Sequence, residues 1–332
     1  MTVTDYEHKH SAHCESGVMS SMLSYYGLHL SEPMVFGLSN ALTFAYLPFI
    51  KIGGMPMIGY RSMPKSIIKN LQKNLKMKMK LETFSTKEKG EARLDELLAE
   101  KKLVGAQTSI YWLPYFPEEM RFHFNVHNLM IYGKEGNEYL ISDPVFEYPV
   151  RCDAKDFAKS RFAKGMLAPK GLLYYPVDVP INIDLKPVII KSIQKTAKGM
   201  LKTPVPIAGL KGIKSLAKAI LKLQKKDTKY AKLFLGHIIR NQEEIGTGGA
   251  GFRYMYASFL KEASELFSDN EALKEASQMM LEVGDKWREF ALMIAKAIRS
   301  KKEIDFQALS DKLLSVKDAE EEVYKKLIVF NG

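Results

Sequence analysis

Strand patterns disappear from this chain after residue 186, and no other feature limits its possible folds as much. Apolar residues then recur at helical spacing in six segments, 187–201, 213–223, 230–244, 252–267, 272–300 and 306–327. Before that point helical and strand patterns alternate, and the segment 176–186 strings together prolines and extended residues. We therefore expect an α+β fold, with a mixed domain at 1–180 followed by an all-α helical domain at 181–332.

Composition narrows the class of protein. The 332 residues are 46% hydrophobic and 26% charged, which is ordinary for a globular chain with real cores. The chain contains no run of 18 apolar residues, and its first residues lack the apolar core of a signal peptide, so we expect a cytoplasmic location. Cys14 and Cys152 are too few for a disulfide framework, and no spacing of Cys and His indicates a metal site.

Cys14 lies at the start of an expected helix. Apolar residues from Val18 to Tyr26 recur at helical spacing, Ser11 or Cys14 lies near the expected N-cap, and Gly27 suits its C-terminal end. The pattern predicts an amphipathic helix over residues 14–26. Free N–H groups and the positive end of the dipole at its first turn favour a thiolate and can hold an oxyanion. Cys14 is thus a candidate nucleophile, although a cysteine in an apolar helix is often a buried structural residue.

His127 and Asp143 lie at the two open ends of an expected β-hairpin. Residues 129–132 and 139–142 are β-prone, and KEGNE supplies the turn between them. A strict two-residue turn at Gly136 and Asn137 would place Asp143 opposite Met130, on the face away from His127. We therefore expect an odd-length turn or a bulge, which brings the carboxylate to the imidazole. His127 is preferred as the base over His123, which is interpreted as a bystander.

Cysteine at a helix start, then histidine on a strand, then aspartate at the end of the next strand is the order found in papain-like cysteine enzymes. The stretch HCESGVMSSMLSYYGLHLSEPMVFGLS resembles the opening of the family named after the N-terminal domain of butirosin biosynthesis protein H. The later stretch GFRYMYASFLKEASEL is similar to the domain that often follows it. Together the two resemblances cover nearly the whole chain.

The resemblance implies a papain-like fold, related to bacteriocin-processing peptidases, and an acyltransferase activity. The named member moves an acyl group from an acyl carrier protein to an amino sugar. Carried over to this sequence, Cys14 is the nucleophile, His127 the base and Asp143 the residue that orients it, in a secondary-metabolite pathway. The phosphopantetheine arrives on the carrier, so no resident cofactor is expected. A cysteine amidase or peptidase with the same triad, and a non-catalytic binding scaffold, are the alternatives.

One departure from the papain pattern concerns the oxyanion. Papain-like enzymes usually carry a glutamine several residues before the cysteine, whereas this chain has His8, His10 and His13 there. The side-chain donor to the oxyanion is therefore left open. The aromatic loop 111–116, before His127, either walls an acyl pocket or packs as a compact loop.

The positive charge of the chain is concentrated in one segment. Between Lys186 and Lys232 there are 13 lysines, one Asp and no Glu or Arg, a net charge of +12 in a chain whose formal net charge is +11. An acidic acyl carrier protein or an anionic membrane surface would be attracted to this segment, or it is simply a solvated face. Nucleic acid is not expected, because arginine and interleaved aromatic residues are absent from it.

The segment GTGGAG, residues 246–251, formally matches the GxGxxG pattern of dinucleotide-binding proteins. It follows a helical pattern rather than a strand, so the required βαβ context is missing. A phosphate cradle and a plain turn between helices remain as its two interpretations. The acceptor of the acyl group, which we expect to be a small molecule, and the oligomeric state leave no signature in the sequence.

Overall fold

The computed structural model describes residues 2–332 and divides the chain into two compact units. The first unit comprises the residues up to Val35 together with Leu71–Ile183, and the second comprises Phe36–Asn70 and Asp184–Gly332. The chain last changes unit after Ile183, within the proline-rich segment that separates the two sequence patterns. The expected division at residue 180 does not account for residues 36–70, which were placed in the first domain and lie in the second unit.

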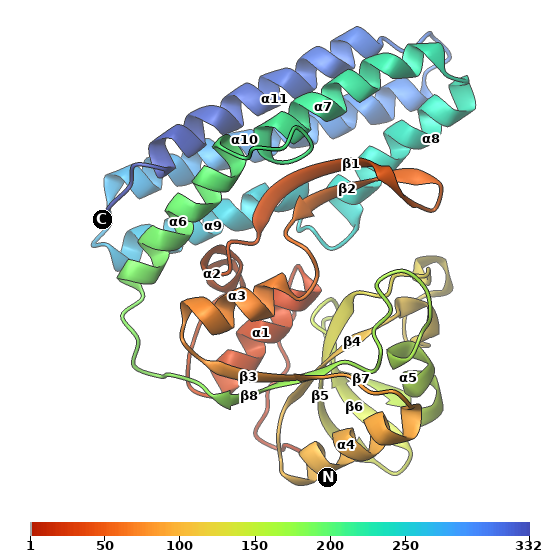
Figure 1. The fold of residues 1–332 in the computed structure, drawn as a ribbon, viewed down its shortest axis with the longest axis vertical. Coiled ribbons are helices and arrows are strands. Elements are labelled where there is room, and N and C mark those ends of the chain that lie inside the picture. Colours follow the sequence, from red (N-terminus) through yellow and green to blue (C-terminus); the bar gives the residue numbers. More distant parts are fainter. Residues whose placement is uncertain (1) are drawn as a thin grey trace. The chain divides into compact units, whose positions relative to one another are not determined.

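The first unit is built on a six-stranded sheet in which every neighbouring pair is antiparallel (Figure 1). Its order is β3–β8–β4–β5–β6–β7. The strands are β3 (Lys78–Glu82), β4 (Val104–Thr108), β5 (His127–Glu135), β6 (Glu138–Ser142), β7 (Val150–Asp153) and β8 (Leu173–Asp178). The expected hairpin is present as β5 and β6, whereas β8 runs into the proline-rich segment 176–186, which was not expected to form a strand.

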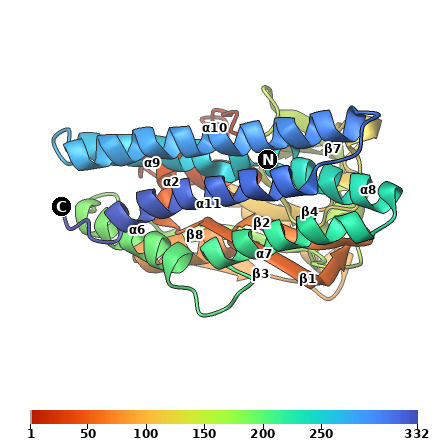
Figure 2. The ribbon, with the colours of Figure 1, turned by 90° about the horizontal axis from the view of Figure 1, so that it is seen from above.

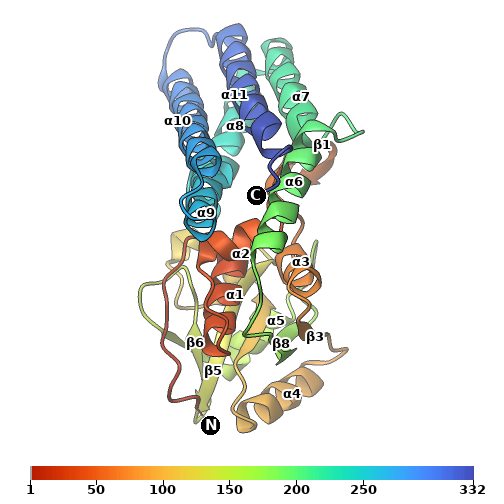
Figure 3. The same cartoon turned by 90° about the vertical axis from the view of Figure 1, so that its left-hand side faces the viewer.

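Helices cover both faces of this sheet, as Figure 1 and Figure 3 show. Helix α1 (Cys14–Tyr25) packs against β5, while α4 (Lys87–Ala99) and α5 (Ala154–Arg161) contribute to the core on the other face. That core includes Leu94 and Phe157 together with the strand residues Leu129 and Ile141. The position of α1 at the centre of the unit explains why its first ten residues, Cys14–Leu23, are all buried. The helix was expected to be amphipathic, but over these ten residues it has no exposed face.

The second unit is a bundle of six helices, confirming the helical character of the C-terminal half. Figure 2 shows α7, α10 and α11 running side by side, in agreement with their mutual packing. The helices are α6 (Lys186–Leu201), α7 (Gly209–Lys222), α8 (Thr228–Ile239), α9 (Arg253–Leu266), α10 (Glu271–Arg299) and α11 (Phe306–Leu327). Among residues 2–332, no helix has both the length and the apolar character needed to cross a bilayer.

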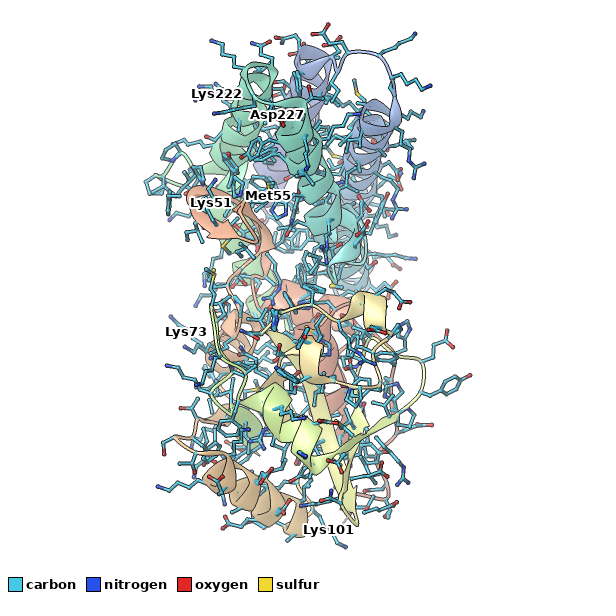
Figure 4. All side chains as sticks on the ribbon, turned by 90° about the vertical axis from the view of Figure 1, so that its right-hand side faces the viewer. Lys51, Met55, Lys73, Lys101, Lys222 and Asp227 are labelled. Atoms are coloured by element: carbon cyan, nitrogen blue, oxygen red, sulfur yellow. The ribbon has the colours of Figure 1, made fainter. Side chains whose placement is uncertain are left out.

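The second unit also contains a hairpin from the N-terminal half of the chain. Strands β1 (Leu42–Ile52) and β2 (Met55–Arg61) pair antiparallel, and Figure 4 labels Lys51 and Met55 on either side of their turn. The Tyr46 N–H donates to the Ile207 carbonyl at 2.8 Å, and Ala45 forms a bridge with Ala208. These bonds attach the hairpin to the connection between α6 and α7. The expected domain division placed these residues in the first domain.

The glycine-rich segment 246–251 forms a turn that leads into α9. Gly249, Ala250, Gly251 and Phe252 all have positive φ, and the Ala250 N–H donates to the Glu243 carboxylate at 3.1 Å. A side chain of the chain itself thus occupies a donor that a phosphate cradle would use. The structure favours the interpretation as a turn between helices.

A fully buried ion pair joins three helices of the bundle. Arg253 of α9 donates through Nε and Nη2 to the two carboxylate oxygens of Glu320 of α11, at 2.8 and 3.2 Å. The indole N–H of Trp287 of α10 donates to the same carboxylate. Burial acts to lower the pKa of Arg253, but the Glu320 carboxylate outweighs it and the pKa is raised. The Arg253 guanidinium therefore stays charged inside the bundle.

Candidate active site

Cys14 is the first residue of α1, as the sequence predicts. The N-cap is His13, whose imidazole Nδ1 accepts from the Ser16 N–H at 3.3 Å, and Cys14 directly follows it, near the N-cap as expected. An imidazole nitrogen can serve here because it supplies the lone pair that a hydroxyl or carboxylate usually provides. Gly27 follows the helix with φ of +90°, in the left-handed conformation expected of it.

A partly buried carboxylate holds the chain in position just before Cys14. Glu32 accepts from the Ala12 N–H at 2.9 Å, from the His13 N–H at 2.8 Å and from the Ser16 hydroxyl at 2.9 Å. Burial raises the pKa of Glu32, and these hydrogen bonds offset only part of the rise. The carboxylate thus satisfies the donors that precede the helix, and the Cys14 N–H remains without a hydrogen-bond partner among residues 2–332.

The two cysteines are both free and buried, but their surroundings differ. Cys14 is 6% exposed and lies beside His127 and Asn128. Cys152 is 1% exposed in the apolar core of the sheet, and burial raises the pKa of its thiol to about 12. A thiol of that kind is held protonated and inert at neutral pH. Cys152 is therefore interpreted as a structural residue.

His127 opens β5 and Asp143 directly follows β6. The turn between these strands is the two-residue Gly136–Asn137 turn, and a bulge lies between Ile131 and Gly133. Because of the bulge, Met130 pairs with Ser142, so that Asp143 falls opposite Leu129 and on the same face as His127. The predicted bulge is confirmed. His127 Nε2 and Asp143 Oδ2 are 2.7 Å apart.

The imidazole of His127 connects the carboxylate to the thiol. Burial acts to lower the pKa of His127, but the charge of Asp143, its hydrogen bond and a further hydrogen bond with the Cys14 side chain raise that pKa to about 10. Since Nε2 is bound to Asp143, the other ring nitrogen is the one left for Cys14. The structure thus brings together the three residues that the sequence singled out.

Asp143 is fully buried and accepts three hydrogen bonds. Besides His127, the Tyr115 hydroxyl donates to Oδ2 at 2.9 Å, and the Val145 N–H donates to Oδ1 at 3.3 Å. Phe116 meets the imidazole edge-on, with ring centroids 5.4 Å apart. The aromatic loop therefore fixes the base and its carboxylate. Of its two predicted roles, compact packing describes Tyr115 and Phe116, whereas Tyr111 and Trp112 are partly exposed.

The histidines that precede Cys14 are engaged elsewhere. His8 contacts Ser142 Oγ at 2.7 Å through Nδ1 and donates to the Phe146 carbonyl at 2.9 Å through Nε2. His13 caps the helix, and His10 lines an open cavity of about 360 Å³ whose walls include neither Cys14 nor His127. His123 stacks on Tyr111 at a centroid distance of 4.1 Å, consistent with its expected role as a bystander.

The side chain next to Cys14 that the sequence did not reveal is Asn128. It is 3% exposed, and its Nδ2 lies 4.0 Å from Cys14 Sγ. Asn128 directly follows His127 and precedes an apolar run of strand residues, and this polar residue beside a buried run is the signal that the sequence offers. Among the described residues, no group of three or more His, Cys, Asp or Glu side chains is arranged to hold a metal ion.

Comparisons with known proteins agree with this architecture. The family model described as "Butirosin biosynthesis protein H, N-terminal" matches residues 13–144, which include Cys14, His127 and Asp143. The model described as "Domain of unknown function (DUF4872)" matches residues 155–327, more than half of the chain. No curated protein matches the chain significantly.

Among solved structures, one from Bacillus anthracis described as a C39-like peptidase is similar to this chain, with 15% identity and a TM-score of 0.37. The similarity covers 53% of this chain and 96% of that one. From the match over more than half of its length, the chain belongs to the family of the DUF4872 domain, and its residues 13–144 match the butirosin biosynthesis protein H N-terminal family.

Proposed function

We propose that this protein is a cysteine acyltransferase of secondary-metabolite biosynthesis. It takes an acyl group from an acyl carrier protein thioester and passes it, through an acyl-enzyme at Cys14, to an amine or hydroxyl of a small acceptor. The observation that carries the proposal is the buried arrangement in which Asp143 binds His127 at 2.7 Å and His127 binds the Cys14 thiol. The family match supports the biosynthetic setting, since its named member is a butirosin biosynthesis protein.

The first half-reaction loads the enzyme. His127 takes the proton of Cys14, and the thiolate attacks the thioester carbonyl to form a new C–S bond while the carbonyl π electrons move to oxygen. The tetrahedral intermediate collapses, and the C–S bond to the carrier breaks. The imidazolium of His127 returns its proton to the departing carrier thiolate. Asp143 keeps the imidazole oriented and stabilises its positive charge throughout.

The second half-reaction transfers the acyl group. An acceptor nitrogen or oxygen attacks the acyl-Cys14 carbonyl, and His127 accepts the acceptor's proton. Collapse of the second intermediate breaks the bond to Sγ, and His127 then returns the proton to Cys14. Burial of Cys14, His127 and Asp143 limits the access of water, which favours transfer over hydrolysis of the acyl-enzyme.

We further propose that the lysine face, defined as the 13 lysines from Lys186 to Lys232, binds the carrier. All of them are exposed except Lys232, which is partly buried, and none forms an ion pair with a carboxylate within residues 2–332. Figure 4 shows Lys222 projecting from the end of α7. Unpaired cations of this density attract an acidic partner and accelerate its association.

The test is intact-mass spectrometry after mixing the protein with acylated carrier. We expect a thioester adduct on Cys14 in the natural sequence and in Cys152→Ala, the matched control for a buried cysteine. Cys14→Ala should fold with a loss of about 1 kcal/mol or less but form no adduct and transfer no acyl group. His127→Gln should accumulate the adduct if attack by the acceptor slows more than loading does.

Two results would contradict the proposal. One is continued acyl transfer by Cys14→Ala. The other is an adduct found only at Cys152, or no adduct with any acylated carrier. Release of free acid without transfer to any amine or hydroxyl would instead identify the enzyme as a hydrolase that uses the same three residues.

A further inference from the structure

The side-chain amide of Asn128 is held in one orientation. Its Nδ2 donates to the Val126 carbonyl at 3.0 Å, and its Oδ1 accepts from the Tyr174 hydroxyl at 3.1 Å. A carbonyl oxygen can only accept, so the amide nitrogen and oxygen cannot be interchanged. Asn128 and Tyr174 are both buried. The amide therefore behaves as a rigid group rather than a rotating side chain.

The second hydrogen of this amide is directed toward the thiol. Nδ2 lies 4.0 Å from Cys14 Sγ, which is the outer limit for a hydrogen bond to sulfur. In the tetrahedral intermediate, the oxyanion and Sγ are bonded to the same carbon atom. A donor at this separation from sulfur can therefore approach the oxyanion to the about 2.7–3.1 Å that effective stabilisation requires.

A second donor faces the same region from the helix. The Cys14 N–H is the first free amide of α1 and has no hydrogen-bond partner within residues 2–332, because Glu32 satisfies the two amides before it. The positive end of the helix dipole adds to its effect on a nearby negative charge. One backbone donor and one side-chain donor are thus available beside the same sulfur atom.

We propose that Asn128 Nδ2 and the Cys14 N–H together form the oxyanion hole of this enzyme. The Asn128 amide on β5 then takes the role of the glutamine that is absent before the cysteine. The inference rests on the proposed function of Cys14 as a nucleophile. Asn128 donates a hydrogen bond to the oxyanion of the tetrahedral intermediate and keeps its proton. Tyr174 acts as a positioning residue, because its hydroxyl orients the amide.

The experiment compares two reactions of Cys14 that differ in their need for an oxyanion hole. Acylation by 4-nitrophenyl acetate passes through a tetrahedral oxyanion, and a burst of nitrophenolate measures it. Alkylation by iodoacetamide displaces iodide at a saturated carbon and forms no oxyanion. The natural sequence should show a burst that is absent in Cys14→Ala, and Asn137→Ala, which removes an exposed amide from the same hairpin, serves as the matched control.

We expect Asn128→Ala to reduce the acylation rate by about 10²–10³-fold, while its alkylation rate stays within about twofold of the natural sequence. Asn128→Leu keeps nearly the volume of the amide and should behave in the same way, even if the alanine variant folds poorly. Tyr174→Phe should reduce acylation by less, because it frees the amide without removing the donor.

Three results would overturn the inference. Acylation at the natural rate in both Asn128 variants would show that the amide is not a donor. An equal loss of acylation and alkylation, in variants that keep their melting temperature, would mean that Asn128 acts on the thiol rather than on the oxyanion. A natural protein without a Cys14 burst would overturn both this inference and the nucleophile. If the burst depends on Asn128 but carrier thioesters never react, only the proposed acyl donor is wrong.

Discussion

At the scale of single residues, Asp143 controls the charge of the candidate site. Its carboxylate binds His127 at 2.7 Å, and the Tyr115 hydroxyl donates to the same oxygen at 2.9 Å. The ordinary pKa of histidine is 6.5, and in this site the pKa of His127 is raised to about 10 despite its burial. The stabilisation from the charged imidazole is therefore complete below pH 6.5 and is lost as the pH rises through about 10.

The direction of this pKa shift leads to a prediction for the variant Asp143→Asn. Without the carboxylate, burial dominates and the pKa of His127 falls, so the imidazolium is lost at a lower pH. We expect the alkaline limb of the pH–rate profile for acyl-enzyme formation to move to lower pH, with a loss of free energy of unfolding that is greatest below pH 6.5. Burst rates from pH 5 to about 10.5 and urea titrations at the two ends of the range check it.

Tyr115→Phe is the milder control for this prediction. It removes one hydrogen bond from Asp143 and leaves the charge in place. The alkaline limb of the pH–rate profile should then shift far less than it does in Asp143→Asn. An unchanged limb in Asp143→Asn would mean that the carboxylate does not govern the protonation of His127.

The two cysteines give a second prediction at this scale. Cys14 contacts an imidazole and an amide, whereas the pKa of the Cys152 thiol is raised to about 12 by burial. We expect iodoacetamide to label Cys14 much faster than Cys152 at pH 7, as measured by peptide mass spectrometry over time. Equally slow labelling of both residues would favour a binding scaffold that lacks a reactive thiol.

Among the elements, the β5–β6 hairpin shows how far the sequence leads. Two β-prone runs and the KEGNE turn predict the hairpin, and the chemical need for His127 and Asp143 to share a face predicts an odd-length turn or a bulge, of which the bulge is present. The position of the bulge, between Ile131 and Gly133, could not be predicted, because the N-terminal residues that pair there are remote in sequence. Thr2 bridges Gly133, and the Val3 N–H donates to the Tyr132 carbonyl at 2.8 Å.

The helix cap and the proposed oxyanion donor could not be predicted either, because both depend on contacts with residues that are distant in sequence. Sequence rules place Ser or Asp at an N-cap, whereas His13 serves here because Ser16 and Glu32 complete its hydrogen bonds. Asn128 lies beside Cys14 only once α1 packs on β5, which no local pattern encodes. Helix spans in the second unit follow from the 3.6-residue period alone and were predicted closely, apart from the start of α7 at Gly209 and the end of α8 at Ile239, after which Arg240–Glu244 form a π-helical segment.

The ion pair between Arg253 and Glu320 allows a prediction about the helices that it joins. Glu320→Gln leaves the Arg253 guanidinium buried without its counter-charge and weakens the bond from Trp287. We expect the free energy of unfolding to fall by about 3–5 kcal/mol. Urea unfolding followed by circular dichroism measures this loss.

The matched control for that variant is Glu322→Gln on the same helix. Glu322 pairs with Lys325 at the surface, so its loss should cost about 1 kcal/mol or less. A similar small effect in Glu320→Gln would show that the buried pair contributes little to the bundle.

For the whole molecule, the lysine face predicts salt-dependent recognition of the carrier. Reversing Lys191, Lys195, Lys198 and Lys202 to Glu should raise the KM for carrier-bound substrate many-fold, because a positive landing surface becomes negative. Turnover of a small thioester with the same acyl group should change little. In the natural protein, the KM for the carrier should rise with salt as the Debye length falls to about 8 Å near physiological ionic strength.

The control changes the net charge equally at another place. Lys69, Lys73, Lys76 and Lys78 are exposed, and their reversal should leave the ratio of carrier-bound to small-thioester turnover near that of the natural sequence. If both quadruple variants behave alike, net charge rather than the lysine face controls the encounter. Loss of binding to anionic vesicles, with an unchanged ratio, would assign the face to a membrane surface.

The division of the chain into units also affects its biosynthesis. Residues 36–70 belong to the second unit, and the hairpin within them bonds to Ile207 and Ala208. At a translation rate of about 5–20 residues per second, these strands leave the ribosome on the order of ten seconds before their partners exist. The first unit meanwhile carries the hairpin as an insertion that lacks its partners from the second unit. A nascent chain of this design exposes β1 and β2 to chaperones for that interval, and no single cut can release either unit intact.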